Sequence, residues 1–204
     1  MTSRTRARRS SSSGLGLILA VAAVLVVAAL FAVSGDPALP STFDPDTAST
    51  PTITGDALAE DSVGDAAPLV RADALLGEGE QVLPADGQAT MIVFLAHWCS
   101  HCNAEVPVVV DWLGAEALPD GVEVVAVATA IDPTLPNYPP DTWLRERDWV
   151  SPTLVDADGS IAASYGVTGY PQWVFVDADG IVRGSAGRQT AEQLSLIAAE
   201  LADL

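Results

Sequence analysis

Residues 90–107 read TMIVFLAHWCSHCNAEVP, a stretch that joins an apolar run, a cysteine pair and a proline five residues later. Its first seven residues are apolar or β-branched without alternation, which is typical of a strand buried on both faces of a sheet. Both cysteines and both histidines of the chain lie in the six residues HWCSHC, 97–102. The chemistry is therefore expected where this strand ends and a helix begins.

Four interpretations of the pair formed by Cys99 and Cys102 compete. A structural disulfide across so short a loop removes little entropy from the unfolded chain and stabilises little. Structural zinc needs four ligands, normally from two separated pairs, so His97 and His101 would have to complete the set. Copper(I) can be held by two thiolates alone and stays open as a candidate.

A redox function agrees best with the position of the pair. A cysteine at a helix N-terminus meets unpaired N–H groups and the positive end of the helix dipole, and both favour the reactive thiolate. Cys99 is expected at that end with an accessible sulfur, so it is expected to attack. Cys102 follows one turn later, is expected to face inward, and would resolve the mixed disulfide.

The rest of residues 67–204 alternates between strand and helix patterns. The expected elements are a helix from Cys99 to about Glu116, a strand over 122–130, an irregular loop over 131–140 with four prolines, a short helix over 141–148 capped by Asp141, a hairpin of 172–176 with 181–184, and a last helix opened by the capping box Thr190–Gln193. This order predicts an α/β fold, with a mixed central sheet covered by helices on both faces.

Three segments of different composition precede that domain. Residues 1–14 form a basic arm with four arginines and no acid. Residues 15–33 contain no charged or polar side chain and would span about 28 Å as a helix, so they predict a transmembrane anchor or uncleaved signal. A cleavable signal peptide ending near Ala32-Val33-Ser34 is the alternative. Residues 34–66, rich in Pro, Asp, Ser and Thr, predict an extended acidic linker.

The charge distribution indicates where the domain functions. After Gly35 the chain carries all 27 carboxylates against five arginines, a net charge of −22. This charge argues against binding nucleic acid or anionic lipid head groups. The basic arm is expected to stay cytoplasmic by the positive-inside rule. We therefore expect a single-pass protein of the cell membrane with its catalytic domain outside the cytoplasm, where disulfides persist.

A wider motif resembles a known group. Trp98-Cys99 with Cys102, then Pro107, and a later Gly-Tyr-Pro ending at Pro171 together resemble a thioredoxin fold over residues 67–204. The run W-C-x-x-C-x-x-E-x-P, with the anchor and acidic linker before it, resembles the TlpA/ResA-like thiol-disulfide oxidoreductases. The resemblance implies thiol–disulfide exchange with protein substrates, with a membrane or exported dithiol protein as electron donor or acceptor and without a bound cofactor or metal.

The resemblance also implies roles for particular residues. Pro171 would be a cis-proline opposite the cysteines, with Tyr170 and Trp98 helping to form the substrate site. Glu105 would handle the proton of the buried cysteine; a solvated helix residue is the alternative. Core packing is the alternative for Trp98. His97 is expected to be a partly exposed neighbour of the pair without a chemical role.

Two departures from the family pattern affect the expected direction of exchange. The buried aspartate of cytoplasmic thioredoxins would fall at Val93, which leaves Glu105 as the local proton acceptor. Many relatives carry proline where this chain has His101, and histidine there resembles the motifs of disulfide-forming oxidases and isomerases. The pair is therefore expected to be reductive, as in cytochrome c maturation, or more oxidising because His101 lowers the thiolate pKa. A copper(I)-handling module is the alternative function.

The topology prediction is testable on the full-length chain. In sealed vesicles of known orientation, protease added on the extracytoplasmic side should digest residues beyond 66, because the Arg-rich arm stays with the cytoplasmic face. Immunoblotting against each end of the chain measures which part is protected. Protection of the acidic domain on the cytoplasmic side would contradict the prediction.

Overall fold

The computed structural model describes residues 41, 43–59, 62–115 and 117–204. The predicted basic arm and the predicted membrane span over 15–33 lie outside the described residues. Among the helices that are described, none has both the length and the apolar composition needed to cross a membrane.

A five-stranded mixed sheet forms the centre, in the order β6-β5-β4-β7-β8. Its middle strand β4 (Ala89–Leu95) pairs in parallel with β5 (Val122–Ala128) and antiparallel with β7 (Gln172–Val176). The edges are β6 (Thr153–Val155), parallel to β5, and β8 (Val182–Ala186), antiparallel to β7. All seven residues of β4 are buried, as its uninterrupted apolar run predicts.

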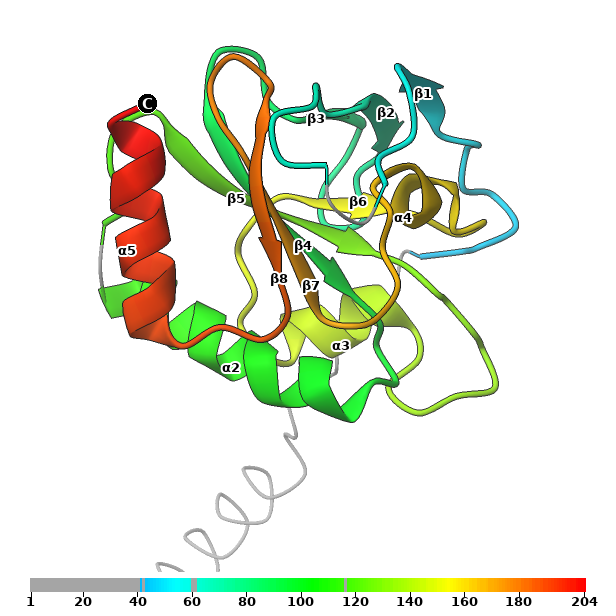
Figure 1. The fold of residues 1–204 in the computed structure, drawn as a ribbon. Coiled ribbons are helices and arrows are strands. Elements are labelled where there is room, and N and C mark those ends of the chain that lie inside the picture. Colours follow the sequence, from blue (N-terminus) through cyan, green and yellow to red (C-terminus); the bar gives the residue numbers. More distant parts are fainter. Residues whose placement is uncertain (1–40, 42, 60–61, 116) are drawn as a thin grey trace, which may run out of the picture. The chain divides into compact units, whose positions relative to one another are not determined.

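Each face of this sheet is covered by a different set of elements (Figure 1). Helices α2 (Ser100–Ala115), α3 (Pro140–Arg145) and α5 (Ala191–Ala202) share one core cluster with alternate residues of β4, Met91 and Val93 among them. The opposite residues of β4 pack with the short helix α4 (Ser160–Ser164) in a second cluster. The predicted α/β thioredoxin-like fold, with a mixed sheet and helices on both faces, is confirmed.

A second, three-stranded antiparallel sheet was not expected. It consists of β1 (Thr52–Thr54), β2 (Leu69–Asp73) and β3 (Glu80–Leu83). Ile53 and Leu58 pack against the second core cluster, and the backbone N–H of Leu58 donates to the Ser164 carbonyl at 2.8 Å. The predicted linker boundary at residue 66 is therefore wrong, because the chain joins the domain from at least residue 52.

Local details around the helices were predicted with mixed success. The capping box of α5 is present, with Thr190 and Gln193 bonded to each other's backbone N–H groups. Asp141, in contrast, does not cap α3: the N-cap is Pro139, and the Asp141 carboxylate is fully buried in an ion pair with Arg145 at 2.6 Å. The strand predicted to run through residue 130 ends at Ala128.

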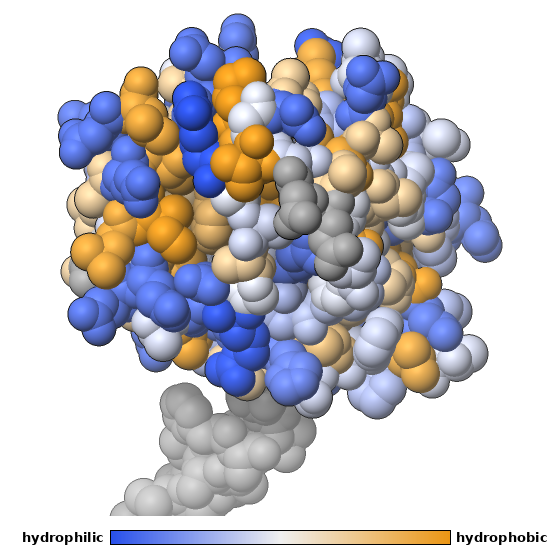
Figure 2. Space-filling model, in the orientation of Figure 1, coloured by the Kyte–Doolittle hydropathy of each residue, from blue (hydrophilic) through white to orange (hydrophobic). Residues whose placement is uncertain are grey.

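The surface agrees with a domain that faces water. On the face shown in Figure 2, hydrophobic residues lie in small groups separated by hydrophilic ones. The large hydrophobic side chains that are exposed among the described residues include Trp98 and Leu135, which belong to the segments around the cysteine pair. Scattered exposed apolar side chains are normal, and of these residues Trp98 directly precedes Cys99.

Candidate functional site

The cysteine pair lies where β4 leads into α2. After β4 ends at Leu95, the chain turns, and the Cys99 N–H donates to the Ala96 carbonyl at 3.0 Å. Cys99 directly precedes the first residue of α2, and its carbonyl accepts the Asn103 N–H at 3.0 Å. Cys99 therefore occupies the cap position of the helix, as predicted, next to the unpaired N–H groups of the first turn.

The two thiols have different surroundings. Both are free; Cys99 is 9% exposed and Cys102 is 0% exposed. The Cys99 thiol donates to the Tyr170 carbonyl at 3.4 Å. Burial raises the pKa of Cys102 far above that of an ordinary thiol, and the charges of Cys99 and Glu105 raise this pKa further, although a hydrogen bond with the Ala96 backbone opposes them. The structure thus pairs one reachable sulfur with one that is deeply buried and held protonated.

Glu105 lies one turn after Cys102 on the same side of α2 and is 0% exposed. Its Oε1 accepts from Trp173 Nε1 at 3.0 Å and from the Gln189 N–H at 2.9 Å. Its Oε2 accepts from Arg188 Nε at 3.2 Å. The alternative of a solvated helix residue is therefore wrong, and the carboxylate lies beneath the pair.

Three residues predicted to form the substrate site come together at Cys99. The Tyr170–Pro171 peptide bond is cis, as predicted, and its carbonyl at Tyr170 is the one that accepts from Cys99. The Trp98 ring meets the Tyr170 ring edge to face, with centroids 6.2 Å apart. Trp98 is 36% exposed while its Nε1 donates to the Ala130 carbonyl at 2.8 Å, so it is fixed at the surface and is not a core residue.

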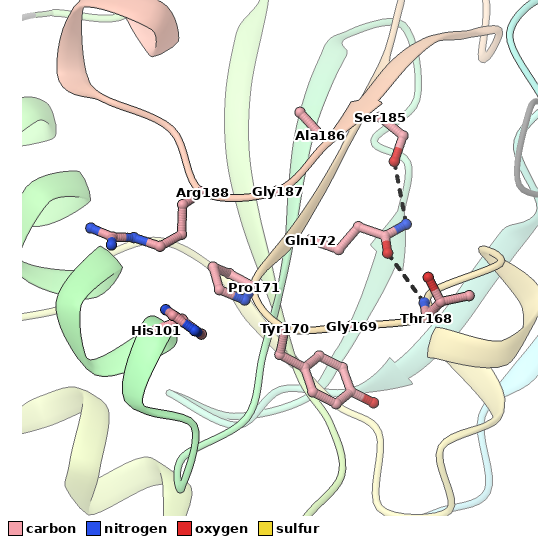
Figure 3. Close-up of a pocket in the computed structure, with 10 residues that line it drawn as sticks. All are labelled: His101, Thr168, Gly169, Tyr170, Pro171, Gln172, Ser185, Ala186, Gly187 and Arg188. Atoms are coloured by element: carbon pink, nitrogen blue, oxygen red, sulfur yellow. Dashed lines mark hydrogen bonds between the residues drawn. The ribbon is translucent and has the colours of Figure 1, made fainter.

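A groove of about 580 Å³ opens beside Pro171 (Figure 3). It is lined by the start of α2, the segment that leads into β7, and the end of β8 with the residues after it: His101, Thr168, Gly169, Tyr170, Pro171, Gln172, Ser185, Ala186, Gly187 and Arg188. The Gln172 amide crosses its floor, accepting from the Thr168 N–H at 3.2 Å and bonded to the Ser185 hydroxyl at 3.3 Å. The structure thereby places His101, an exposed residue, at the edge of this groove.

His97 differs from its prediction as a partly exposed neighbour, because it is only 1% exposed. The Asp132 N–H donates to Nε2 at 3.2 Å, so the ring proton lies on Nδ1, which donates to the Pro136 carbonyl at 2.7 Å. The ring also packs edge to face on Tyr138. His97 therefore fixes the proline-rich loop over 131–140 to the end of β4.

Asn103 was missed by sequence reasoning and connects the cysteine turn to its surroundings. Its Nδ2 donates to the carbonyls of Cys99 at 2.9 Å and His97 at 3.2 Å. Its Oδ1 accepts from Trp143 Nε1 and Arg147 Nη2, each at 3.0 Å. An amide residue in the first turn of a helix was the only sequence signal, and it does not reveal partners 40 residues away.

The arrangement does not supply the ligands of a zinc site in the described part of the chain. No group of three or more histidine, cysteine, aspartate or glutamate side chains is placed to share an ion there. His97 is bonded through both ring nitrogens to the loop over 131–140, so it is not available to the cysteine pair.

Comparisons with known proteins agree with this geometry. Residues 62–193 match the Redoxin family model. Thiol-disulfide oxidoreductase ResA from Oceanobacillus iheyensis is 33% identical over 131 residues, covering 60% of this chain and 66% of the relative. ResA from Bacillus thuringiensis subsp. konkukian is 28% identical over 134 residues, covering 65% and 74%.

A solved structure shows the same likeness. The crystal structure of a secreted Mycobacterium tuberculosis disulfide oxidoreductase homologous to E. coli DsbE matches with a TM-score of 0.52 and 27% identity, covering 64% of this chain and 95% of that one. The family match spans well over half of the sequence, and the cysteine pair and the cis-proline lie within the matched residues. The chain therefore belongs to the Redoxin family and is a disulfide oxidoreductase with a thioredoxin-like fold of the ResA/TlpA kind.

Proposed function

We propose that the chain exchanges disulfides with protein substrates through Cys99 and Cys102. In the reductive direction, the Cys99 thiolate attacks a substrate disulfide, and one substrate sulfur leaves and takes up a proton. The Cys102 thiolate then attacks the Cys99 sulfur of the mixed disulfide and releases the second substrate thiol. The substrate gains two electrons and the pair becomes a disulfide; the oxidative direction is the reverse. The different burial of the two cysteines, with Cys99 9% exposed and Cys102 0% exposed, is the observation that carries this proposal.

The resolving step needs a proton acceptor, because the raised pKa of Cys102 keeps its thiol protonated at neutral pH. Glu105 is the buried carboxylate whose charge acts on Cys102, and it lies one turn along the same helix. We assign to it the transfer of the Cys102 proton. Its three donors hold it in place for this role.

The substrate would bind across Trp98, Tyr170 and Pro171. Tyr170 contacts Cys99 through its carbonyl and Trp98 through its ring, and Tyr170 and Pro171 also line the groove. The carbonyl that receives the Cys99 thiol is next to the cis peptide bond, so a substrate sulfur that approaches Cys99 passes directly over Tyr170 and Pro171.

The proposed setting is the outer face of the cell membrane, with the chain anchored through residues 15–33 and the pair regenerated by a membrane or exported dithiol protein. The sequence pattern of arm, apolar run and acidic domain supports it. Reduction of disulfides, as in cytochrome c maturation, and a more oxidising exchange are the two directions, and His101 is the residue that would decide between them.

Alkylation of the reduced chain tests the assignment of the two sulfurs. At pH 7, iodoacetamide should modify Cys99 well before Cys102, because Cys102 is buried and its pKa is raised. In a Cys99→Ser variant, labelling of Cys102 should remain slow until the pH is far above that for an ordinary thiol. Peptide mass spectrometry follows both sites with time, and equal labelling rates at pH 7 would remove the nucleophile assignment.

Trapping of the mixed disulfide tests the function. A Cys102→Ser variant should accumulate a covalent adduct with a disulfide-bonded protein substrate, because the resolving sulfur is missing. The matched Cys99→Ser variant should form none, and non-reducing electrophoresis with mass spectrometry measures both. Tight binding of one copper(I) ion by the reduced chain, without any adduct in the variant, would favour the copper-handling alternative.

The reduction potential tests the direction of exchange. His101→Pro should lower the reduction potential, and a fall of about 30 mV corresponds to about 1.4 kcal/mol less stabilisation of the reduced pair. The reason is that a cation near the thiolate stabilises the reduced form and not the disulfide. Equilibration with glutathione buffers measures the potential, with His101→Gln as an uncharged control. A potential that stays unchanged in both variants would show that His101 has no part in it.

A further inference from the structure

Arg188 connects the open groove with the buried acid beneath the cysteines. Its side chain is 48% exposed, while the Glu105 side chain that it contacts is 0% exposed. The contact runs from Nε to Oε2 at 3.2 Å, and the next residue, Gln189, donates its N–H to the other oxygen of the same carboxylate. Arg188 therefore contacts the buried Glu105 through Nε, stays half exposed, and is one of the residues that line the groove.

The charge of the groove differs from that of the domain around it. Of its ten lining residues, His101 and Arg188 can carry positive charge and none is an aspartate or glutamate. The chain after Gly35 has a net charge of −22. Both basic side chains lie on the same side of Pro171, away from the Tyr170 ring (Figure 3). The groove beside the cysteines is thus lined by basic and neutral side chains, although the net charge of the domain is strongly negative.

The ion pair with Glu105 does not cancel this charge as seen from the groove. A guanidinium has five N–H donors in a planar fork, and within the described residues the structure shows one hydrogen bond from Arg188, through Nε. The carboxylate lies behind the guanidinium and is shielded from water. The two Nη groups make no hydrogen bond within the described residues, so they remain available to a carboxylate.

We propose that this groove selects substrate segments with a carboxylate next to the reactive cysteine, and that Arg188 binds that carboxylate while retaining its bond to Glu105. The inference rests on the proposed function and deepens it, because it names the class of protein substrate. It makes Arg188 a specificity-determining residue. The substrate carboxylate and the proton-transferring Glu105 then share one guanidinium.

The net negative charge of the domain does not argue against such a substrate. At physiological ionic strength the screening length is about 8 Å, so distant surface carboxylates act weakly on a segment bound in the groove. The nearest charges dominate, and the charge that borders the groove is that of Arg188, whose partner Glu105 is fully buried. An acidic segment bound in the groove is therefore attracted by the nearby positive charge. This attraction offsets the weak repulsion that the net negative charge of the domain exerts during the approach.

Three disulfide peptides that differ only at the residues flanking the attacked cysteine test the proposal. One peptide carries Glu at these positions, the second Gln and the third Lys. The full-length reduced chain, in neutral detergent, is mixed with each peptide, and the reduction of the peptide is followed in a single-turnover assay. The second-order rate should be about three- to tenfold higher for the Glu peptide than for the Gln peptide, as expected for one charge-assisted contact. The Lys peptide should be the slowest. The Glu preference should shrink when the salt concentration rises.

Two variants and a control locate the effect. Arg188→Gln should bring the Glu-to-Gln rate ratio close to one, and Arg188→Lys should keep part of the preference because the charge remains. Arg71→Gln removes the same charge from an exposed pair with Glu80 on the small sheet and should leave the ratio unchanged. The readout is the ratio of the rates for the Glu and Gln peptides. A variant of Arg188 that disturbs Glu105 lowers the rates for all three peptides alike and leaves this ratio unchanged.

The possible failures are distinguishable. Equal rates for the Glu and Gln peptides with the unaltered chain would overturn the proposed selection, while thiol exchange itself would stand. A preference that survives in Arg188→Gln would remove the assignment to this residue. If the reduced chain reduced none of the three peptides and the oxidised chain oxidised none of their dithiol forms, the proposed function would be overturned together with the selection.

Discussion

The buried carboxylate of Glu105 holds together three parts of the domain that meet beneath the cysteine pair. It belongs to α2, accepts from the indole of Trp173 on β7, and accepts from Arg188 and Gln189 in the connection between β8 and α5. A buried charge costs several kcal/mol unless it is paired and hydrogen-bonded. Its position is therefore fixed by its partners, and the floor of the active site and the wall of the substrate groove are set by the same two oxygens.

The parts of the fold that local patterns determine were predictable from the sequence. The uninterrupted apolar run of β4, the cysteine turn and the capping box at Thr190 each depend on neighbouring residues, and each is present as expected. The resemblance added the cis bond before Pro171 and the importance of Glu105. The small sheet was missed because its strands are only three to five residues long and its pairing depends on the second core cluster.

The errors around the site share a physical cause. His97 reads as a polar residue near a surface turn, yet it is buried because the loop over 131–140 folds back and supplies a carbonyl and an N–H for its ring. Asp141 has the sequence position of a helix cap, but its carboxylate is buried, where it accepts from the Ser41 hydroxyl, 100 residues away, at 2.7 Å and pairs with Arg145. Asn103 gains partners from α3 and the residues after it. In each case the deciding partner lies in a segment whose position depends on the whole fold.

The surroundings of the two sulfurs separate the control of equilibrium from the control of rate. A neighbouring positive charge stabilises the reduced pair relative to the disulfide only when one of the two thiols is ionised at the ambient pH. Because the pKa of Cys102 is raised far above neutrality, its thiolate is scarcely populated, and a further rise changes the reduction potential very little. Electrostatic tuning of the potential must then act through Cys99, and the candidate residue for it is His101, two positions later in the first turn of α2. In the proposed mechanism Glu105, by contrast, accepts the proton that Cys102 has to lose, which makes it a determinant of how fast the mixed disulfide is resolved.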